Sequence, residues 1–152
     1  KPILADNVNA INSLDIAKDR GIDIQEIHSN SEAEFVNCVT LELVTDKESL
    51  EVLGTLSSNK KPRIVKVNKV YVEAVPSGNI LFIRNDDVPG IVGAVGTALG
   101  NAKVNIAYIT FGRESEAKMA VSVVNVDGEV PSSVIDALKA VKGIQFVKML
   151  KV

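Results

Sequence analysis

The chain has 152 residues, of which 46% are hydrophobic and 24% charged, a balance typical of a globular protein with one ordinary domain or two small ones. Its net charge of -2 argues against the basic surface that binds nucleic acid or an anionic membrane. No run approaches the roughly 18 consecutive apolar residues of a membrane-spanning helix, and we expect no signal peptide. We therefore expect a cytoplasmic protein with neither a nucleic-acid nor a membrane partner. The first residue is Lys1 rather than Met, so we also expect a piece of a longer protein.

The first half of the chain predicts one helix followed by strands. Apolar residues on one helical face indicate a helix over residues 8–20, which Gly21 ends. Hairpin turns are predicted at Asp46-Lys47 and at Asn68-Lys69. One helix and several antiparallel strands make a small α+β domain. The strands are expected at residues 22–29, 34–44, 48–57, 63–68 and 69–75.

The second half has a clearer pattern and follows a turn-rich junction at residues 75–79, so we expect one domain over residues 1–76 and another over residues 77–152. Its order is strand, helix, strand, strand, helix, strand. This order predicts the ferredoxin-like arrangement, an antiparallel sheet with both helices on one face, and an α+β fold overall. The strands are expected at residues 79–84, 104–111, 119–123 and 144–152, with helices over 91–100 and 131–142.

Groups that could carry catalysis are scarce. The single histidine, His28, and the single cysteine, Cys38, exclude the usual His/Cys metal clusters. Cys38 lies in an alternating apolar stretch, where strand packing is a better interpretation than a reactive thiol. No Gly-x-Ser-x-Gly elbow is present. We expect no catalytic residue, no metal site and no cofactor in this chain. The glycines at positions 90, 93, 96 and 100 form neither a dinucleotide nor a Walker A pattern and indicate close helix packing.

The strand-to-helix loop at residues 85–90 has the chemistry of an amino-acid site. A helix N-terminus offers unpaired backbone N–H groups that suit a carboxylate. Asp87 beside it could pair with an ammonium group. Equally, Asp87 could cap the helix, which typically contributes about 1 kcal/mol. The spacing leaves both roles open.

A basic cluster in the first half has two interpretations as well. It could hold a phosphorylated anion, or it could be a solvated loop and strand edge, which is the usual role of a charge run. Its members are Lys60, Lys61, Arg63 and Lys66.

The second half resembles the ACT domain, a small-molecule sensor attached to many enzymes of amino-acid biosynthesis. The resemblance rests on Ile83, the run Asp87 to Gly93, Leu99 and the run Val104 to Ile106. Residues 8–10 and 16–22 are similar to the segment that links the catalytic part of D-3-phosphoglycerate dehydrogenase to its intervening domain. Shorter matches at residues 54–56, 63–65 and 67–68 fit that intervening domain. The chain therefore resembles the C-terminal regulatory region of the long type of that enzyme family, an allosteric substrate-binding domain followed by an ACT domain.

The resemblance implies a parent oxidoreductase that oxidises 3-phosphoglycerate with NAD in serine biosynthesis, with its catalytic domains upstream of Lys1. It also implies that L-serine, or a similar small amino acid, binds between two ACT domains for feedback control and that the domains self-associate as a dimer or tetramer. One subunit would supply the loop and its neighbour Asn105. At Asn85 the family often has a histidine or tyrosine. The resemblance further implies that Lys61, Arg63 and Lys66 contact a phosphorylated acid. The effector site implied on the loop would comprise Asn85, Asp87, Val88, Pro89, Gly90 and Ile91.

Two alternatives remain open at this point. The iron–sulfur L-serine dehydratases also pair these two domain types, although the linker residues favour the dehydrogenase. The ligand site could also be vestigial, leaving a structural dimerisation module. In either case the strand over residues 104–111 is expected at the sheet edge, where it would pair with a second copy about a two-fold axis.

Overall fold

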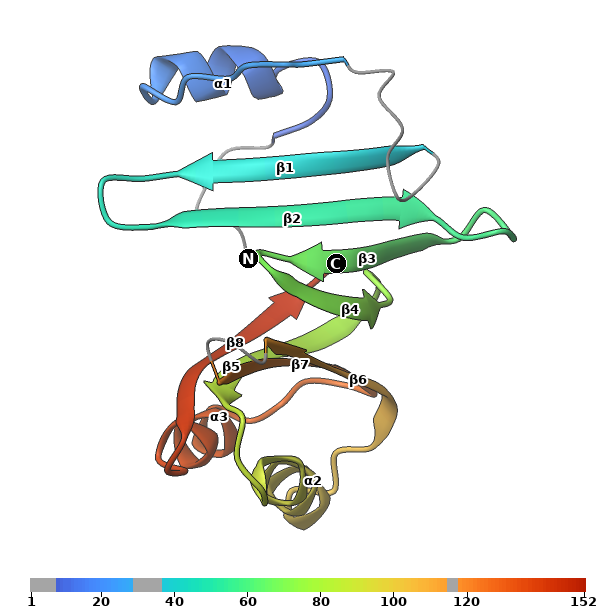
Figure 1. Ribbon diagram of the computed structural model, residues 1–152, viewed down its shortest axis with the longest axis vertical. Coiled ribbons are helices and arrows are strands. Elements are labelled where there is room, and N and C mark those ends of the chain that lie inside the picture. Colours follow the sequence, from blue (N-terminus) through green and yellow to red (C-terminus); the bar gives the residue numbers. More distant parts are fainter. Residues whose placement is uncertain (1–7, 29–36, 115–117) are drawn as a thin grey trace. The chain divides into compact units, whose positions relative to one another are not determined.

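A computed structural model describes residues 8–28, 37–114 and 118–152 of the chain (Figure 1). It divides into two compact units, residues 1–34 and 35–152, and each is described by itself. The division into domains at residues 76 and 77 stays a prediction. None of the helices in the described part of the chain has the length and apolar character needed to cross a bilayer.

The described part of the first unit contains one helix, α1 (Ser13–Asp19). The Asn9 side-chain oxygen accepts the backbone N–H groups of Ile11 and Asn12, at 2.9 and 3.2 Å. This local turn competes with helix, so α1 begins at Ser13 rather than at residue 8 as predicted. The helix ends before Gly21, whose φ of 69° is the left-handed conformation expected after a helix.

The strand predicted over residues 22–29 is wrong for residues 22–28, which have no regular secondary structure; residue 29 lies outside the described part. The isoleucines Ile22, Ile24 and Ile27 gave this segment strand propensity, but all three side chains are exposed. A strand forms through pairing with a neighbour, which propensity does not supply.

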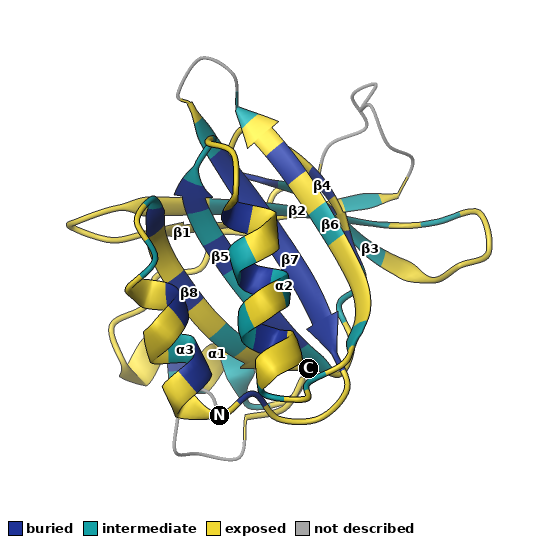
Figure 2. Cartoon of the chain, turned by 90° about the horizontal axis from the view of Figure 1, so that it is seen from below, coloured by how far each residue is buried: buried dark blue, intermediate teal, exposed yellow. Residues whose placement is uncertain are grey.

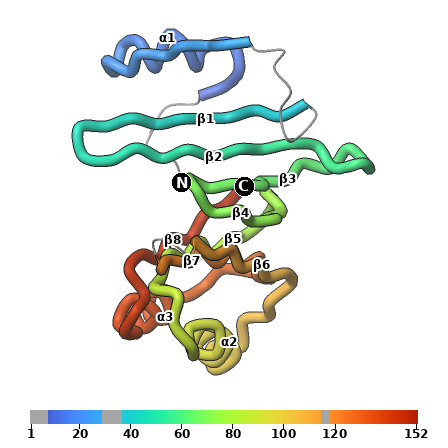
Figure 3. The backbone as a smooth tube through the Cα atoms, in the orientation of Figure 1, coloured from blue at the N-terminus to red at the C-terminus, as the bar shows by residue number. Residues whose placement is uncertain are grey.

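The second unit begins with a four-stranded antiparallel meander in the order β1-β2-β3-β4, which can be followed along the tube in Figure 3. The two predicted hairpin turns are confirmed. Thr45 Oγ1 accepts the backbone N–H of Lys47 at 3.3 Å and that of Glu48 at 3.0 Å in the first turn, and Asn68 takes a positive φ of 52° in the second. Residues 34–36 of the predicted first strand lie outside the described part. The strands are β1 (Cys38–Val44), β2 (Ser49–Leu56), β3 (Pro62–Val67) and β4 (Val70–Ala74).

The remainder of the chain has the predicted ferredoxin-like order, which is confirmed together with the α+β class. The strands pair antiparallel in the order β6-β7-β5-β8. Both helices cover the same face of this sheet (Figures 1 and 2). The elements are β5 (Asn79–Asp86), α2 (Ile91–Asn101), β6 (Ile106–Glu114), β7 (Met119–Val126), α3 (Ser132–Lys139) and β8 (Ile144–Lys151).

Each face of the second sheet has its own core. On the helix side, fully buried Leu81 and Ile83 of β5 pack with Val95 and Leu99 of α2 and Leu138 of α3. Burial of this kind contributes about 1.5–3 kcal/mol for each large aliphatic side chain. It fixes the position of α2, and therefore of the loop that leads into it.

On the opposite face, β4 packs against the sheet, and Val70 and Val72 share a core with Val121 and Val123 of β7. The approach is closest at Gly112 of β6. A Cβ atom there would overlap the Tyr71 carbonyl oxygen and lie 2.6 Å from Val70 Cγ1, so only glycine fits.

Candidate functional site

The loop between β5 and α2 is fixed at one end by hydrogen bonds of Asp86 and at the other end by the conformation of Gly90. The Asp86 N–H donates to the Gly143 carbonyl at 2.7 Å, and the Asp86 side chain accepts the Gln145 amide at 2.6 Å. At the other end Gly90 is the N-cap of α2 with a φ of 97°, a conformation that favours glycine. Gly90 has no side chain and so cannot cap the first N–H groups of α2. Within the described part of the chain, the helix therefore presents N–H donors that its N-cap residue leaves unpaired.

An open hollow of about 460 Å³ lies at this helix N-terminus. The volume is in the range of small-molecule pockets. It is lined by the first turn of α2 and its loop and by two side chains of β6, Phe111 and Arg113. The lining residues are Asp87, Val88, Pro89, Gly90, Ile91, Val92, Gly93, Phe111 and Arg113.

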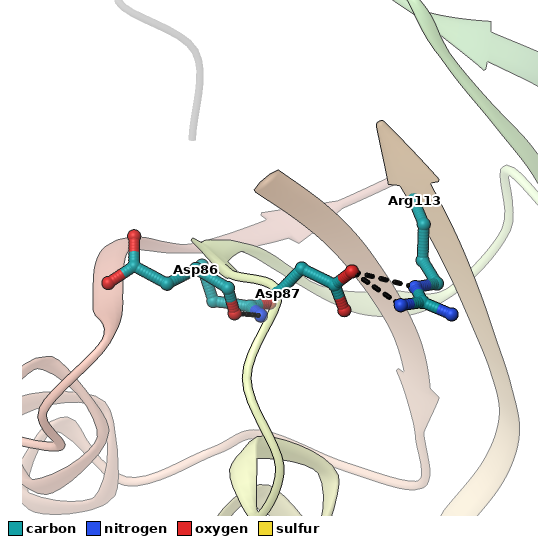
Figure 4. Close-up of polar contacts among 4 residues, drawn as sticks. Asp86, Asp87 and Arg113 are labelled. Carbon is teal, nitrogen blue, oxygen red and sulfur yellow. Dashed lines mark hydrogen bonds and ion pairs between the residues drawn. The ribbon is translucent and has the colours of Figure 1, made fainter. Parts of the chain in front are cut away.

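The acidic side chain of this hollow, Asp87, pairs with Arg113 across the gap between the loop and β6 (Figure 4). Arg113 Nε donates to Asp87 Oδ2 at 2.8 Å, and Arg113 Nη2 lies 2.6 Å from the same oxygen in an ion pair. The carboxylate accepts this hydrogen bond and attracts the guanidinium charge, which together raise the pKa of Arg113 above its usual value. The Asp87 side chain is 18% exposed and that of Arg113 64%. Asp87 therefore turns toward β6 and does not cap α2.

Asn85 lies on β5, in line with Leu81 and Ile83, and faces the covered side of the sheet. Its side chain is fully buried, and its Nδ2 donates to the Asp86 carbonyl at 2.6 Å. Its Oδ1 accepts no hydrogen bond within the described part of the chain. Asn85 is not among the residues that line the hollow.

Asn105 is far from the hollow along β6. The strand pairings place Asp86, Met119 and Glu114 at one end of the sheet and Asn79, Val126 and Ile106 at the other. Asn105 precedes Ile106 and so lies at the end opposite Asp87. There its Nδ2 donates to Asp127 Oδ2 at 2.7 Å. One copy of the chain therefore does not bring Asp87 and Asn105 together.

Phe111 and Arg113 are not among the site residues predicted from the sequence. The predicted strand ends at residue 111 and so gives no reason to place Arg113 beside Phe111. The structure extends β6 to Glu114, and residues 111 and 113 then point to the same side of the strand. The alternation Ile109, Phe111, Arg113 was present in the sequence and could have indicated the longer strand.

The basic cluster has partners of its own. Lys66 lies 3.5 Å from the Glu51 carboxylate and 5.9 Å from the centre of the Tyr71 ring. Arg63 Nη1 donates to the Pro62 carbonyl at 2.9 Å. A bulge between Ile64 and Lys66 keeps Arg63 and Lys66 on one face, opposite Thr55 and Leu53. Lys61 is exposed in the preceding turn.

Within the described ranges, neither the histidine nor the cysteine belongs to a cluster of three metal-binding side chains. His28 lies 3.1 Å from the Glu26 carboxylate with both side chains exposed. Cys38 is a free, half-buried thiol at the start of β1. Among the described residues there is no group of three His, Cys, Asp or Glu side chains that could hold a metal ion.

Comparison with known proteins agrees with this architecture. Residues 79–143 match the ACT domain, and residues 1–68 match the D-3-phosphoglycerate dehydrogenase intervening domain. The chain thus carries an ACT-type regulatory domain preceded by an intervening domain. It belongs to the D-3-phosphoglycerate dehydrogenase family, of which it covers the regulatory part.

The similarity to individual relatives extends over nearly the whole chain. It is 30% identical over 150 residues to a D-3-phosphoglycerate dehydrogenase of Bacillus subtilis, covering 99% of this chain and 29% of that protein. It is 33% identical over 149 residues to one of Methanocaldococcus jannaschii, covering 98% of this chain and 28% of that protein. A third, from Synechocystis, is 30% identical over 142 residues, which are 93% of this chain and 26% of that protein. The chain spans less than a third of the length of these relatives.

Proposed function

We propose that this chain is the amino-acid sensor of a D-3-phosphoglycerate dehydrogenase, binding L-serine or a similar small amino acid for feedback control of serine biosynthesis. The parent would carry out NAD-dependent oxidation of 3-phosphoglycerate in the cytoplasm, with NAD bound by catalytic domains outside this chain. The observation that carries the proposal is the hollow at the N-terminus of α2. It combines an acidic side chain, Asp87, with backbone N–H donors that no side chain caps.

These two features suit the two charges of a free amino acid. The ligand carboxylate would accept hydrogen bonds from the first N–H groups of α2, where the helix dipole favours negative charge. The ammonium would bind Asp87. Val88, Pro89 and Ile91 would contact the ligand's aliphatic part, and Asn85 would support the loop from beneath.

The second part of the proposal is that the site is completed by a second copy of the chain. β6 is an edge strand of its sheet, with Tyr108, Ile109 and Phe111 partly exposed. Unpaired edges of this kind invite pairing. Antiparallel pairing of two β6 strands about a two-fold axis would lay the start of one strand beside the end of the other. Asn105 of one copy would then approach the Asp87 loop of its partner, giving two equivalent sites per dimer.

The first domain, which we assign to residues 1–76, is proposed to bind a phosphorylated acid through Lys61, Arg63 and Lys66, ahead of the ACT domain at residues 77–152. The shared face of Arg63 and Lys66 supports this assignment, because two cations on one face suit a phosphate. The ion pair between Lys66 and Glu51 opposes this assignment, because it places a carboxylate beside one of the two cations.

The experiment that tests the proposal is calorimetric titration of the chain with L-serine, together with a measurement of its mass in solution. Asp87→Ala should abolish serine binding and leave the dimer intact, because it removes a ligand contact and not the strand pairing. Asn105→Ala should weaken serine binding more mildly. Asp136→Ala is the matched control, because Asp136 is also an acid paired with a cation, but its pair is exposed and lies on α3. Unchanged serine affinity in Asp87→Ala, or a monomeric wild-type chain, would defeat the proposal.

The ion pair between Asp87 and Arg113 favours a second function, a structural dimerisation module whose ligand site is filled by the protein itself. A dimer that ignores L-serine and other small amino acids in the same titration would establish it. The regulatory region of an iron–sulfur L-serine dehydratase is disfavoured, because residues 1–68 match the dehydrogenase intervening domain.

A further inference from the structure

The Asp87–Arg113 pair leaves specific atoms unused. Arg113 Nε donates to Asp87 Oδ2, and Nη2 lies closest to the same oxygen. Oδ1 has no hydrogen-bond partner within the described part of the chain. A guanidinium has five N–H donors, of which the one on Nε donates to Asp87. Among the described residues, the pair therefore presents an unused acceptor beside unused donors.

The charges of the pair decide which ligand it can accept. Asp87 and Arg113 together are neutral, so an ammonium group that approaches Oδ1 meets the repulsion of the guanidinium as well as the attraction of the carboxylate. A ligand whose only charged group is an ammonium therefore gains little binding free energy from the pair. A zwitterion also carries a carboxylate, which the guanidinium attracts.

The positions of the groups favour this arrangement. Arg113 extends from β6 and lines the same hollow as the first turn of α2, residues 90–93, which belongs to a different element. A carboxylate in the hollow would lie between the N–H groups of α2 on one side and the Arg113 guanidinium on the other. Charge-assisted hydrogen bonds from a guanidinium are among the stronger polar contacts in proteins.

We propose that Arg113 is the specificity-determining residue of this site, selecting α-amino acids over simple amines by donating hydrogen bonds to the ligand carboxylate. This inference rests on the proposed amino-acid binding at Asp87. Without ligand the guanidinium neutralises Asp87. With ligand it keeps its contact with Oδ2 and turns its unused N–H groups to the carboxylate, while the ammonium binds Oδ1.

The test compares L-serine with ethanolamine, which has the same ammonium and hydroxyl groups and no carboxylate. Wild-type protein should bind L-serine and discriminate strongly against ethanolamine. Arg113→Gln should weaken L-serine binding about tenfold or more, the usual effect of losing a hydrogen bond to a charged group. The same substitution should improve ethanolamine binding, because it removes the repelling charge. Arg113→Lys, which keeps the charge without the planar fork, should lie between wild type and Arg113→Gln.

The control is Lys139→Gln, which removes a cation from the exposed pair with Asp136 and should leave both affinities unchanged. Thermal melting verifies that each variant is folded. Tighter binding of both ligands by Arg113→Gln would make Arg113 a competitor for Asp87 and overturn the inference, as would an unchanged L-serine affinity. If no variant and no wild-type sample binds any amino acid, the proposed function itself fails, and the inference fails with it.

Discussion

The two sheets of the second unit contain strands that are similarly apolar in sequence but differ in burial. β7 (MAVSVVNV) is buried at every position after its first, whereas β1 (CVTLELV) is exposed at every position after its first (Figure 2). β7 has a strand on each side, helices over one face and β4 over the other. Among the described strands, β1 pairs with β2 alone and lies at its sheet's edge. An apolar strand pattern therefore identifies a segment that can be buried. Whether it is buried depends on the strands and helices that pack against it.

The largest loss of stability is expected in the sheet that contains β5 and β7, which is covered on both faces. Leu81→Ala in β5 removes a fully buried side chain from the helix-covered face of the sheet, and such truncations cost about 2–5 kcal/mol. The free energy of unfolding from urea denaturation should fall by that amount. A loss below about 1 kcal/mol would mean that this core readily collapses around the cavity.

An intermediate effect is expected where the two sheets meet. Gly112→Ala places a methyl group against the Tyr71 carbonyl and the valines of β4, and overpacking of this kind costs about 1–3 kcal/mol. Denaturation should show this loss, and hydrogen exchange should be faster in both β4 and β6. Gly96→Ala on α2 is the control, because nothing lies within 4 Å of a Cβ atom there. Equal effects of the two substitutions would contradict close packing at Gly112.

The smallest change in the free energy of unfolding is expected for a substitution in β1. Leu41→Ala is the same chemical change as Leu81→Ala, but Leu41 is 69% exposed. The expected change in unfolding free energy is within about 0.5 kcal/mol, as for most surface substitutions. A cost comparable to that of Leu81→Ala would show that another surface covers β1 in solution.

The order of elements in the second sheet could be predicted from sequence because each element carries its own pattern. The spacing of Val95 and Leu99 marks α2, and Pro131 marks the start of α3, which ends at Lys139, before the predicted stop at Gly143. The segment at residues 22–28 has the composition of a strand but not the pairing, and pairing is a property of the whole fold. Its prediction failed for that reason.

The residues of the candidate site also fall into two groups: those that the sequence places together and those that only the fold brings together. The acid, the glycine and the helix N-terminus are contiguous in sequence, so Asp87 and Gly90 could be identified together. Arg113 is 26 residues from Asp87 and reaches it only because β6 and β5 flank β7 in a fixed register. Without that register, nothing in the sequence relates the two residues. Asn85 was assigned from resemblance, and strand alternation places it beneath the loop and outside the hollow.

The glycine at position 112 gives β6 a second role beside forming the sheet. On one face of the strand, Arg113 contacts the loop before α2; on the other, one residue earlier, the bare backbone lies against β4. A side chain can change rotamer and absorb a small displacement, but a backbone-to-backbone contact has no such slack. A shift of β6 near the hollow would therefore press directly on the backbone of β4.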